Sequence, residues 1–311
     1  MSQSMQDRDG KIWMDGTLVE WREAKVHILT HTLHYGFGVF EGIRCYQTDT
    51  GSGSAVFRLT EHIDRLFGSA HILNIKIPFS KGEIIHACLE VLRQNGMKAG
   101  YLRPLVYLGA DSLGINPKPC KVRVAVACWE WGAYLGEEGM ENGIRIKTSS
   151  YTRHHPNVTM TRAKAVGNYS NSILAKTEAL TAGFDEALLL DTEGYVAEGS
   201  GENVFMLRKG ILKTPPLDSA LEGITRDAVM TLAREMGYVV QEQRFPRDEL
   251  LLADEAFFTG TAAEVTPIRE LDNRQIGIGK AGPVTKAIQK RFFDVVHGRD
   301  PSHLDWLTQV Y

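Results

Sequence analysis

The chain opens with short segments in which apolar and β-branched residues surround turn residues. Residues 12–14 and 17–21 are rich in apolar side chains and flank Asp15-Gly16. Because this dipeptide tolerates positive φ, the pattern predicts a β-hairpin with a tight turn. Residues 39–46 and 55–59 have the composition of further strands. The first part of the chain is therefore expected to form a sheet.

Two amphipathic helices are expected to follow these strands. Thr60 is a candidate N-cap for a helix over residues 61–73, where apolar residues recur at helical spacing. Ser80 and Glu83 have the spacing of a capping box, which predicts a second helix that ends at Gly96. Two strands are then expected, over residues 101–108 and 122–129.

A segment rich in glycine and acidic residues, from Trp131 to Gly139, interrupts this pattern and is the candidate interdomain linker. We expect a smaller N-terminal α/β domain over 1–130, a linker over 131–140 and a larger cofactor-binding domain over 141–311. Expected strands in the second domain cover 144–148, 186–191, 195–197, 203–207 and 211–214, with a strand pair near Val239 and Phe257. Expected helices cover 166–182 and 225–236, and a last one begins at Gly282-Pro283. Because strands and helices alternate irregularly, the pattern predicts an α+β fold.

Composition is that of an ordinary globular chain. The 311 residues, 43% hydrophobic and 23% charged, suffice for roughly two domains. The formal net charge of −3 gives no support to a nucleic-acid partner. Four cysteines without CxxC spacing are expected to be reduced thiols. No apolar run approaches the length of a membrane span, so the expected location is the cytoplasm.

Three segments carry the candidate chemistry. Lys164 lies among small residues and could hold an aldehyde cofactor once its amine is deprotonated. Glu198 and Glu202 lie in a glycine-rich turn, and we expect Glu198 to face a pyridine nitrogen, although both could be exposed turn acids. Gly223-Ile224-Thr225 opens a helix whose free N–H groups suit a phosphate, although an ordinary threonine cap explains the turn equally well. Together these are the parts of a pyridoxal-phosphate site.

Other segments add phosphate-binding and specificity candidates. Gly260-Thr261-Ala262 is a second turn that can donate amides to an anion. Arg58, between a strand and a helix, can complete a phosphate site. Aromatic residues near arginines, as in Phe40-Glu41-Gly42-Ile43-Arg44 and Tyr101-Leu102-Arg103, indicate either an aromatic core or an apolar pocket with one placed arginine.

Three further patterns give weaker support for other kinds of site. Residues 277–282 match G-x-G-x-x-G, but too little chain follows for a dinucleotide-binding unit. His27, His31 and His34 have helical spacing without a nearby acidic or cysteine metal ligand. Gly199-Ser200-Gly201 lacks the spacing of a hydrolase nucleophile elbow.

In combination the segments resemble the class IV, or fold type IV, pyridoxal-phosphate aminotransferases, and specifically the branched-chain amino acid aminotransferases. The family pattern is met in unbroken order by Glu198, Asn203-Val204-Phe205, Leu212-Lys213-Thr214 and the segment from Leu221 to Arg226. One departure is Glu222, where many members have proline. The resemblance implies two α/β domains joined by a short linker, with the cofactor in the cleft between them.

The resemblance also implies roles for individual residues. Lys164 is similar to the Schiff-base lysine and general base, Tyr169 to the residue that bonds the cofactor's phenolic oxygen, and Glu198 to the partner of the pyridine nitrogen. The implied phosphate-binding positions are Arg58, Ile224, Thr225 and Thr261. Leu221, Gly223 and Gly260 are further implied cofactor-binding positions. The implied substrate-binding positions are Tyr35, Phe40, Gly42, Tyr101, Arg103, Trp131, Tyr134 and Ala262. Among these, Arg103 with Tyr35 would meet the γ-carboxylate of glutamate.

The implied reaction is a reversible ping-pong transfer of an amino group from leucine, isoleucine or valine to 2-oxoglutarate. A D-amino acid aminotransferase or an aminodeoxychorismate lyase on the same fold is the alternative, and the segments around Phe40 and Arg103 argue against both. The expected partners are these small molecules, with neither nucleic acid nor membrane. Family members form homodimers, some of which assemble into hexamers, and the resemblance implies the same here.

Overall fold

The protein is described by a computed structural model that covers residues 4–51, 53–132 and 134–311. Its chain divides into two compact units. The first unit comprises Met1–Trp131, Ala163–Gly167 and Val296–Tyr311, and the second comprises Gly132–Arg162 and Asn168–Val295. The change of unit after Trp131 falls at the start of the expected linker. However, two later segments group with the first unit, so the units differ from the expected division at 131–140.

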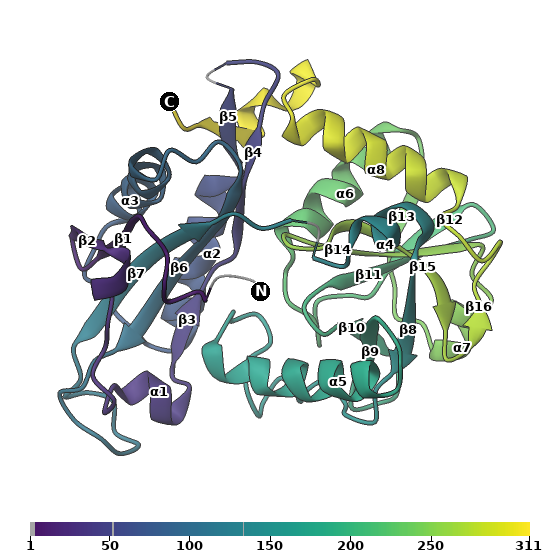
Figure 1. Cartoon of the computed structure of the whole chain (residues 1–311). Coiled ribbons are helices and arrows are strands. Elements are labelled where there is room, and N and C mark those ends of the chain that lie inside the picture. Colours follow the sequence, from purple (N-terminus) through teal and green to yellow (C-terminus); the bar gives the residue numbers. More distant parts are fainter. Residues whose placement is uncertain (1–3, 52, 133) are drawn as a thin grey trace. The chain divides into compact units, whose positions relative to one another are not determined.

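Within the described residues, the first unit contains an eight-stranded sheet in which every pairing is antiparallel (Figure 1). The strand order is β17-β5-β4-β6-β7-β1-β2, and β3 pairs with β6. The strands are β1 Lys11–Met14, β2 Thr17–Glu20, β3 Gly38–Phe40, β4 Ile43–Gln47, β5 Ser54–Phe57, β6 Gly100–Leu108, β7 Val122–Trp129 and β17 Leu307–Gln309. C-terminal strand β17 pairs with β5, so the two ends of the sequence contribute to one sheet.

The sheet confirms the predicted hairpin and corrects one predicted strand. Asp15 and Gly16 have φ of 48° and 97°, as the tight turn between β1 and β2 requires. The predicted strand over 39–46 is wrong as a single element, because Glu41 and Gly42 separate β3 from β4. The buried carboxylate of Glu41 is bound by side chains of a helix rather than facing solvent, as described below.

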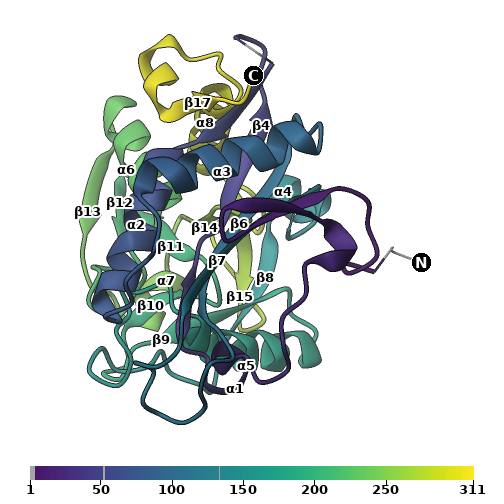
Figure 2. The same cartoon turned by 90° about the vertical axis from the view of Figure 1, so that its left-hand side faces the viewer.

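Two long helices, α2 Leu59–Ile72 and α3 Lys81–Gln94, pack on this sheet (Figure 2). Ser80 and Glu83 form the predicted capping box of α3. Thr60 is not the cap of α2, since the helix already begins at Leu59 and its N-cap is Arg58, with φ of 51°. The core between helices and sheet is apolar and includes Ile43, Leu66 and Val91. Short elements missed by the pattern complete the unit: α1 His31–Tyr35, η1 Trp21–Glu23 and η3 Pro301–Trp306.

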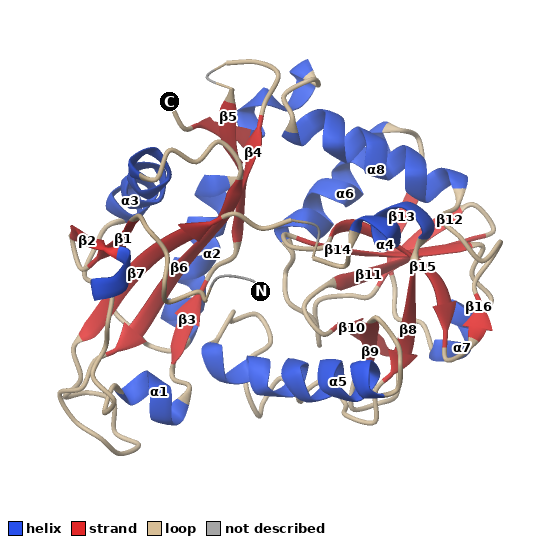
Figure 3. Cartoon of the chain, in the orientation of Figure 1, coloured by secondary structure: helices blue, strands red, loops and turns tan. Residues whose placement is uncertain are grey.

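The second unit contains a mixed sheet of nine described strands (Figure 3). The order is β10-β9-β8-β15-β14-β11-β12-β13, and β16 pairs with β15. The strands are β8 Ile144–Thr148, β9 Glu186–Leu190, β10 Val196–Gly199, β11 Asn203–Arg208, β12 Ile211–Thr214, β13 Val239–Glu242, β14 Glu255–Gly260, β15 Glu264–Leu271 and β16 Arg274–Gln275. Pairs β8–β9, β8–β15 and β12–β13 are parallel and the other pairs are antiparallel.

The strands expected near Val239 and Phe257 are both present, as β13 and β14, but they do not pair with each other. Strand β13 pairs with β12, whereas Phe257 lies on β14 between β11 and β15. Strand β15 was missed, because Pro267 lies within it and the preceding turn residues obscure its start. The helices of the unit are α4 Glu137–Asn142, α5 Tyr169–Thr181, α6 Ile224–Glu235, α7 Arg247–Leu251 and α8 Pro283–Val296, with η2 Val166–Asn168 at the junction before α5. Helix α4 begins inside the expected linker and ends two residues beyond it.

The observed mixture of sheets and helices confirms the predicted α+β class. In the described part of the chain, no helix combines the length and hydropathy needed to cross a membrane. All four cysteines are buried free thiols.

Candidate functional site

Lys164 belongs to the first unit and is held there by its main chain. Its carbonyl accepts a hydrogen bond from the Phe40 amide at 3.1 Å, and its amide donates to Ser69 Oγ on α2 at 3.0 Å. Ala165 forms a β-bridge with Val39, next to Phe40 on β3. The segment is thus fixed between a strand and a helix, and the Lys164 amine lies 5.2 Å from the centre of the Phe40 ring.

Several predicted substrate-binding residues gather on strands of the first unit. Arg103 on β6 places its guanidinium carbon 4.7 Å from the centre of the Phe40 ring. The rings of Tyr101 and Trp131 are in edge contact, with centroids 4.4 Å apart. Gly42 lies against the Tyr101 hydroxyl, since a Cβ built on Gly42 would be only 1.9 Å from that oxygen. A glycine is therefore required at position 42 while Tyr101 keeps its position.

Arg58 and Tyr35 lie at the edges of elements in the same unit. Arg58 bonds to Glu61 one turn along α2, and its guanidinium lies 4.8 Å from the Trp306 ring centre. Tyr35 ends α1 and is 46% exposed. Its ring contacts the neighbouring His31 and His34 rings, and these histidines hydrogen-bond to the carbonyls of Gly114 and Ile28.

Sequence reasoning missed a buried network beside Lys164. Glu41, fully buried, accepts two hydrogen bonds from Arg65, from Nε at 2.7 Å and from Nη2 at 2.9 Å, and contacts His62 Nδ1 at 2.7 Å. His62, Arg65 and Ser69 lie on one face of α2, at positions i, i+3 and i+7. That spacing within an otherwise apolar face was the available signal.

The network has a defined charge state. Burial by itself raises a carboxyl pKa, but the Arg65 charge and the His62 hydrogen bond hold the pKa of Glu41 well below its ordinary value. Burial lowers the pKa of His62, and the charges of Arg65 and Lys164 lower it further against the opposing effect of Glu41. At neutral pH the network is therefore an ionised carboxylate, a guanidinium and a neutral imidazole that donates from Nδ1.

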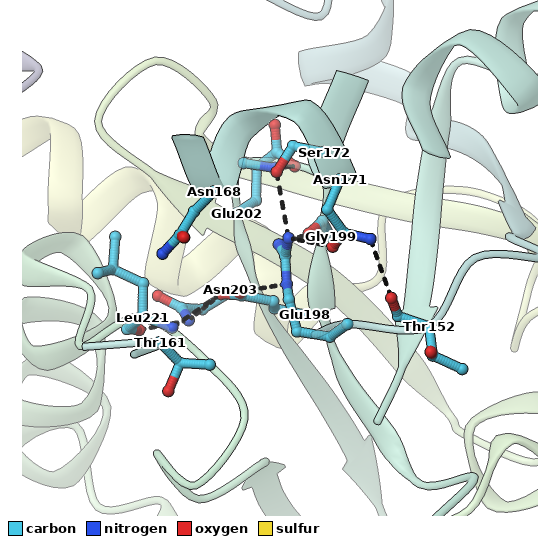
Figure 4. Close-up of polar contacts among 12 residues, drawn as sticks. Thr152, Thr161, Asn168, Asn171, Ser172, Glu198, Gly199, Glu202, Asn203 and Leu221 are labelled. Atoms are coloured by element: carbon cyan, nitrogen blue, oxygen red, sulfur yellow. Dashed lines mark hydrogen bonds and ion pairs between the residues drawn. The ribbon is translucent and has the colours of Figure 1, made fainter. Parts of the chain in front are cut away.

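Glu198 belongs to the second unit, where it lies on β10 close to Asn203 and Leu221 (Figure 4). The buried Arg153 is its cationic partner. Arg153 Nε is 2.9 Å from Glu198 Oε1, and because the N–H is not aligned with that oxygen, the contact is an ion pair rather than a hydrogen bond. Glu198 Oε2 accepts from the Leu221 amide at 3.1 Å and from Asn203 Nδ2 at 3.4 Å. These contacts stabilise an ionised carboxylate.

The sequence did not predict a role for Arg153 either. Its remaining nitrogens donate to Asn171 Oδ1 at 2.9 Å, Ser172 Oγ at 3.2 Å and the Gly199 carbonyl at 3.1 Å. The guanidinium therefore joins α5 to the end of β10. A single arginine in a loop gives no sequence signal for this role.

Glu202 differs from Glu198 in its electrostatic surroundings. Burial and the neighbouring carboxylate of Glu186 raise the pKa of Glu202 to about 8. Glu202 Oε2 accepts from the Gly201 amide, and Glu186 pairs with Lys176 at 2.6 Å. A carboxyl group that holds its proton at neutral pH cannot supply the negative charge that a protonated pyridine nitrogen needs. The contrast favours Glu198 over Glu202 for that position.

The turn before α6 has the features of an anion site. Gly223 is the N-cap of this 12-residue helix and provides no side-chain cap. A Cβ on Gly223 would lie 1.9 Å from Asn203 Oδ1, and Asn203 Nδ2 also donates to the Leu221 carbonyl at 3.0 Å. Ile224 and Thr225 begin the helix, where amide groups and the helix dipole favour an anion.

The other predicted residues of the second unit lie at the ends of elements. Gly260 ends β14, and Thr261 and Ala262 form the turn to β15. Tyr169 is the first residue of α5. Tyr134 has its ring 5.3 Å from the Lys176 amine.

These residues fit the chemical groups of pyridoxal phosphate. The aldehyde carbon needs an amine, the pyridine N–H⁺ needs an ionised acid, and the phosphate needs amides and a positive field. The chain provides Lys164 held beside Phe40, Glu198 held beside Arg153, and the α6 turn without a side-chain cap.

Comparison with known proteins agrees with this assignment. Residues 38–271 match the family model described as amino-transferase class IV. A branched-chain-amino-acid aminotransferase of Pseudomonas aeruginosa is 55% identical over 307 residues, which cover 99% of this chain and 99% of that protein. A crystal structure of the T.th. branched-chain amino acid aminotransferase with pyridoxamine 5'-phosphate has a TM-score of 0.94 and 52% identity, with 98% of this chain and 99% of that chain covered. The same enzyme complexed with N-(5'-phosphopyridoxyl)-L-glutamate has a TM-score of 0.93 and 51% identity, with the same coverage. The chain belongs to the class IV aminotransferase family, as its order of motifs predicts.

Proposed function

We propose that this protein is a pyridoxal-phosphate-dependent branched-chain amino acid aminotransferase. It moves the amino group of L-leucine, L-isoleucine or L-valine reversibly to 2-oxoglutarate, with the branched 2-oxo acid and L-glutamate as products. The observation that carries this proposal is the similarity along almost the entire chain to enzymes of that name, including one complexed with a phosphopyridoxyl-glutamate. No finding favours a D-amino acid aminotransferase or an aminodeoxychorismate lyase.

Lys164 is the proposed proton carrier. When bound, pyridoxal phosphate supplies an electron sink that acidifies the substrate Cα–H. The Lys164 amine then moves a proton between the substrate Cα and the cofactor C4′. Because Phe40 and Ser69 fix the main chain of Lys164 on both sides, the amine acts from a defined position.

Residues of the second unit have the proposed tasks of holding the ring and the phosphate. Glu198, kept ionised by Arg153, stabilises the protonated pyridine nitrogen. Tyr169 would donate a hydrogen bond from its hydroxyl group to the phenolic oxygen of the cofactor. The phosphate is held by the α6 turn and the β14–β15 turn, through Leu221, Gly223, Ile224, Thr225, Gly260 and Thr261.

The proposed phosphate arginine is Arg58, as the sequence predicts. It is the N-cap of α2, where it pairs with Glu61 and its guanidinium lies 4.8 Å from the Trp306 ring centre. Arg65, on the same helix, has a different task, because its Nε and Nη2 donate to the buried carboxylate of Glu41.

Residues from both units have proposed contacts with the substrate. Thr261 and Ala262 amides with Tyr101 hold the α-carboxylate, and Arg103 with Tyr35 meets the γ-carboxylate of glutamate. The apolar side chain of leucine contacts Phe40, Tyr35, Trp131, Tyr134 and Tyr169, next to Gly42.

A homodimer is the proposed minimal assembly, with a hexamer as its higher form. The first unit exposes apolar side chains on α1, just before it and on a loop that His31 joins to it: Leu33 is 61% exposed, Ile28 72% and Ile115 93%. A surface of this kind suits a second copy of the chain. Light scattering of the purified protein measures the assembly, and a monomer would contradict the proposal. The proposed location is the cytoplasm.

Absorption spectroscopy and substrate assays test the proposed function. The holoenzyme is expected to show a visible cofactor band that borohydride abolishes, with the reduced label on Lys164 in a peptide map. It is expected to transfer the amino group of L-leucine to 2-oxoglutarate and to prefer L-leucine to D-alanine. A colourless protein that takes up no pyridoxal phosphate would contradict the cofactor assignment, and a preference for D-alanine would contradict the substrate assignment.

A further inference from the structure

Arg103 is surrounded by aromatic rings in the first unit. Its guanidinium carbon lies 4.7 Å from the Phe40 centroid, 5.5 Å from Tyr101 and 5.7 Å from Trp129. Its Nε is buried and has no hydrogen-bond partner among the residues that the structure describes. Three rings at cation–π distance thus provide much of the surroundings of this charge.

Trp129 reaches Arg103 because of the strand register. Strands β6 and β7 pair Tyr101 with Trp129 and Arg103 with Ala127. Arg103 and Trp129 are therefore diagonal neighbours on one face of an antiparallel pair, within reach of long side chains. The Trp129 ring also contacts Tyr101, with centroids 5.4 Å apart, and Trp131 at 5.8 Å.

This arrangement addresses a physical difficulty in the proposed reaction, on which the inference rests. A guanidinium keeps its charge at any physiological pH. Glutamate brings a carboxylate to pair with it, but leucine brings only methyl groups and expels the water that hydrates the charge in the free enzyme. A charge that loses both water and counterion is costly to bury. A site that accepts both amino acids therefore needs another group that stabilises the Arg103 charge when leucine is bound.

We propose that Phe40, Tyr101 and Trp129 form an aromatic box that stabilises the charge of Arg103 when a branched-chain substrate is bound, and that Trp129 is a specificity-determining residue of this enzyme. The rings replace water without adding a negative charge, so the box leaves the guanidinium available to the γ-carboxylate of glutamate. Phe40 and Tyr101 also have proposed contacts with substrate, whereas Trp129 contributes to the box from β7 without a proposed substrate contact.

The test compares two substrates in two matched variants. Trp129→Leu removes the ring and keeps apolar bulk, and Trp129→Phe keeps a ring. The measured quantity is kcat/KM of the holoenzyme for L-leucine and for L-glutamate in separate half-reactions. Trp129→Leu is expected to lower the leucine-to-glutamate ratio about fivefold, equal to about 1 kcal/mol. Trp129→Phe is expected to change the ratio by less than about twofold.

Two results would overturn the inference. Equal losses for both amino acids would show that Trp129 only shapes the pocket wall, and a larger loss for glutamate would show that the ring orients Arg103 toward a carboxylate. If Trp129→Leu does not fold, Trp129→Met provides the same comparison with a longer side chain. Wild-type turnover of both amino acids tests the proposed function separately, because the inference concerns only the ratio.

A double-variant cycle adds an independent readout. In an Arg103→Met background there is no charge for the rings to stabilise. Trp129→Leu is then expected to leave the leucine-to-glutamate ratio of that background unchanged. A fivefold fall of the ratio in both backgrounds would contradict the box, since the effect of Trp129 would not depend on Arg103.

Discussion

Neighbouring residues of one type can have opposite tasks because their surroundings differ. Glu198 and Glu202 are four positions apart and both are buried. Arg153 and two hydrogen-bond donors stabilise the ionised form of Glu198, whereas burial and Glu186 raise the pKa of Glu202 to about 8. The sequence places both acids in one turn, and only their three-dimensional partners distinguish them.

Arg103→Ala is expected to reduce kcat/KM for L-glutamate about 10- to 100-fold more than for L-leucine. A charge-assisted hydrogen bond to the γ-carboxylate contributes about 1.5–3 kcal/mol, and leucine has no such group. Steady-state kinetics with both amino acids measure the difference. Equal losses would mean that Arg103 has another role.

Arg58 and Arg65 can be distinguished by their effect on phosphate recognition. Arg58→Lys keeps a positive charge at the start of α2 but removes the forked guanidinium, and Arg65→Lys, at the arginine that binds Glu41, is the matched control. Arg58→Lys is expected to reduce the preference for pyridoxal phosphate over pyridoxal by about tenfold, since one hydrogen bond to a charged group contributes about 1.5–3 kcal/mol. Fluorescence titration of the apoprotein measures both affinities. A larger effect from Arg65→Lys would contradict the assignment of Arg58.

Arg153→Met is expected to destabilise the protein by about 3–5 kcal/mol, because it leaves the Glu198 carboxylate buried without its cation. Denaturant unfolding of the apoprotein measures the loss. The double variant Arg153→Met/Glu198→Gln removes both charges and is expected to recover part of it. If the single variant unfolds at the same denaturant concentration as the wild type, the ion pair does not stabilise Glu198.

At the scale of elements, local signals identified most helices and strands, and failures have physical causes. The capping box of α3 and the hairpin of β1 and β2 depend on residues a few positions apart, so the pattern reveals them. By contrast, the strand expected over 39–46 is interrupted at Glu41 because Arg65 and His62, on a helix, bind its carboxylate. Strand β13 is present where it was expected, but it pairs with β12, and that pairing depends on tertiary packing.

Gly223→Ala tests the close approach at the start of α6. The new Cβ would clash with Asn203 Oδ1, so we expect a loss of about 1–3 kcal/mol in unfolding free energy and weaker cofactor retention. The control is Gly68→Ala, at a position in α2 where no atom lies within 4 Å of the new Cβ. That variant is expected to be about 0.5–1 kcal/mol more stable than wild type. Equal changes in unfolding free energy for the two variants would contradict a packing role for Gly223.

At the scale of the whole molecule, segments distant in sequence complete each unit. Ala163–Gly167, which contains Lys164, and the C-terminal segment from Val296 both group with the first unit. The reactive lysine is therefore positioned by β3 and α2, although some 90 residues or more separate it from both in sequence. Composition alone does not predict that these later segments of the chain pack with the first unit.

The raised pKa of Glu202 predicts how global stability depends on pH. Between its ordinary value of 4.5 and about 8, the folded protein binds a proton at Glu202 that the unfolded chain releases. This contribution to stability is therefore complete below the unfolded pKa and is lost as pH rises through about 8. Glu202→Gln, which keeps the shape of the neutral acid, is expected to show a smaller decline, by up to about 1.4 kcal/mol per pH unit. Denaturant unfolding between about pH 5 and 9 measures it, and identical slopes would contradict the assignment.

The sequence by itself determined the α+β class, the family, the cofactor and most elements, because these depend on periodicity, caps and motifs that are local or strictly ordered along the chain. Tertiary structure alone decided which group lies beside each buried charge: Arg65 beside Glu41, Arg153 beside Glu198, and the Trp129 ring beside Arg103. The physical reason is that a buried charge is stabilised by whichever partner packing brings within a few ångströms, and sequence separation does not record that distance.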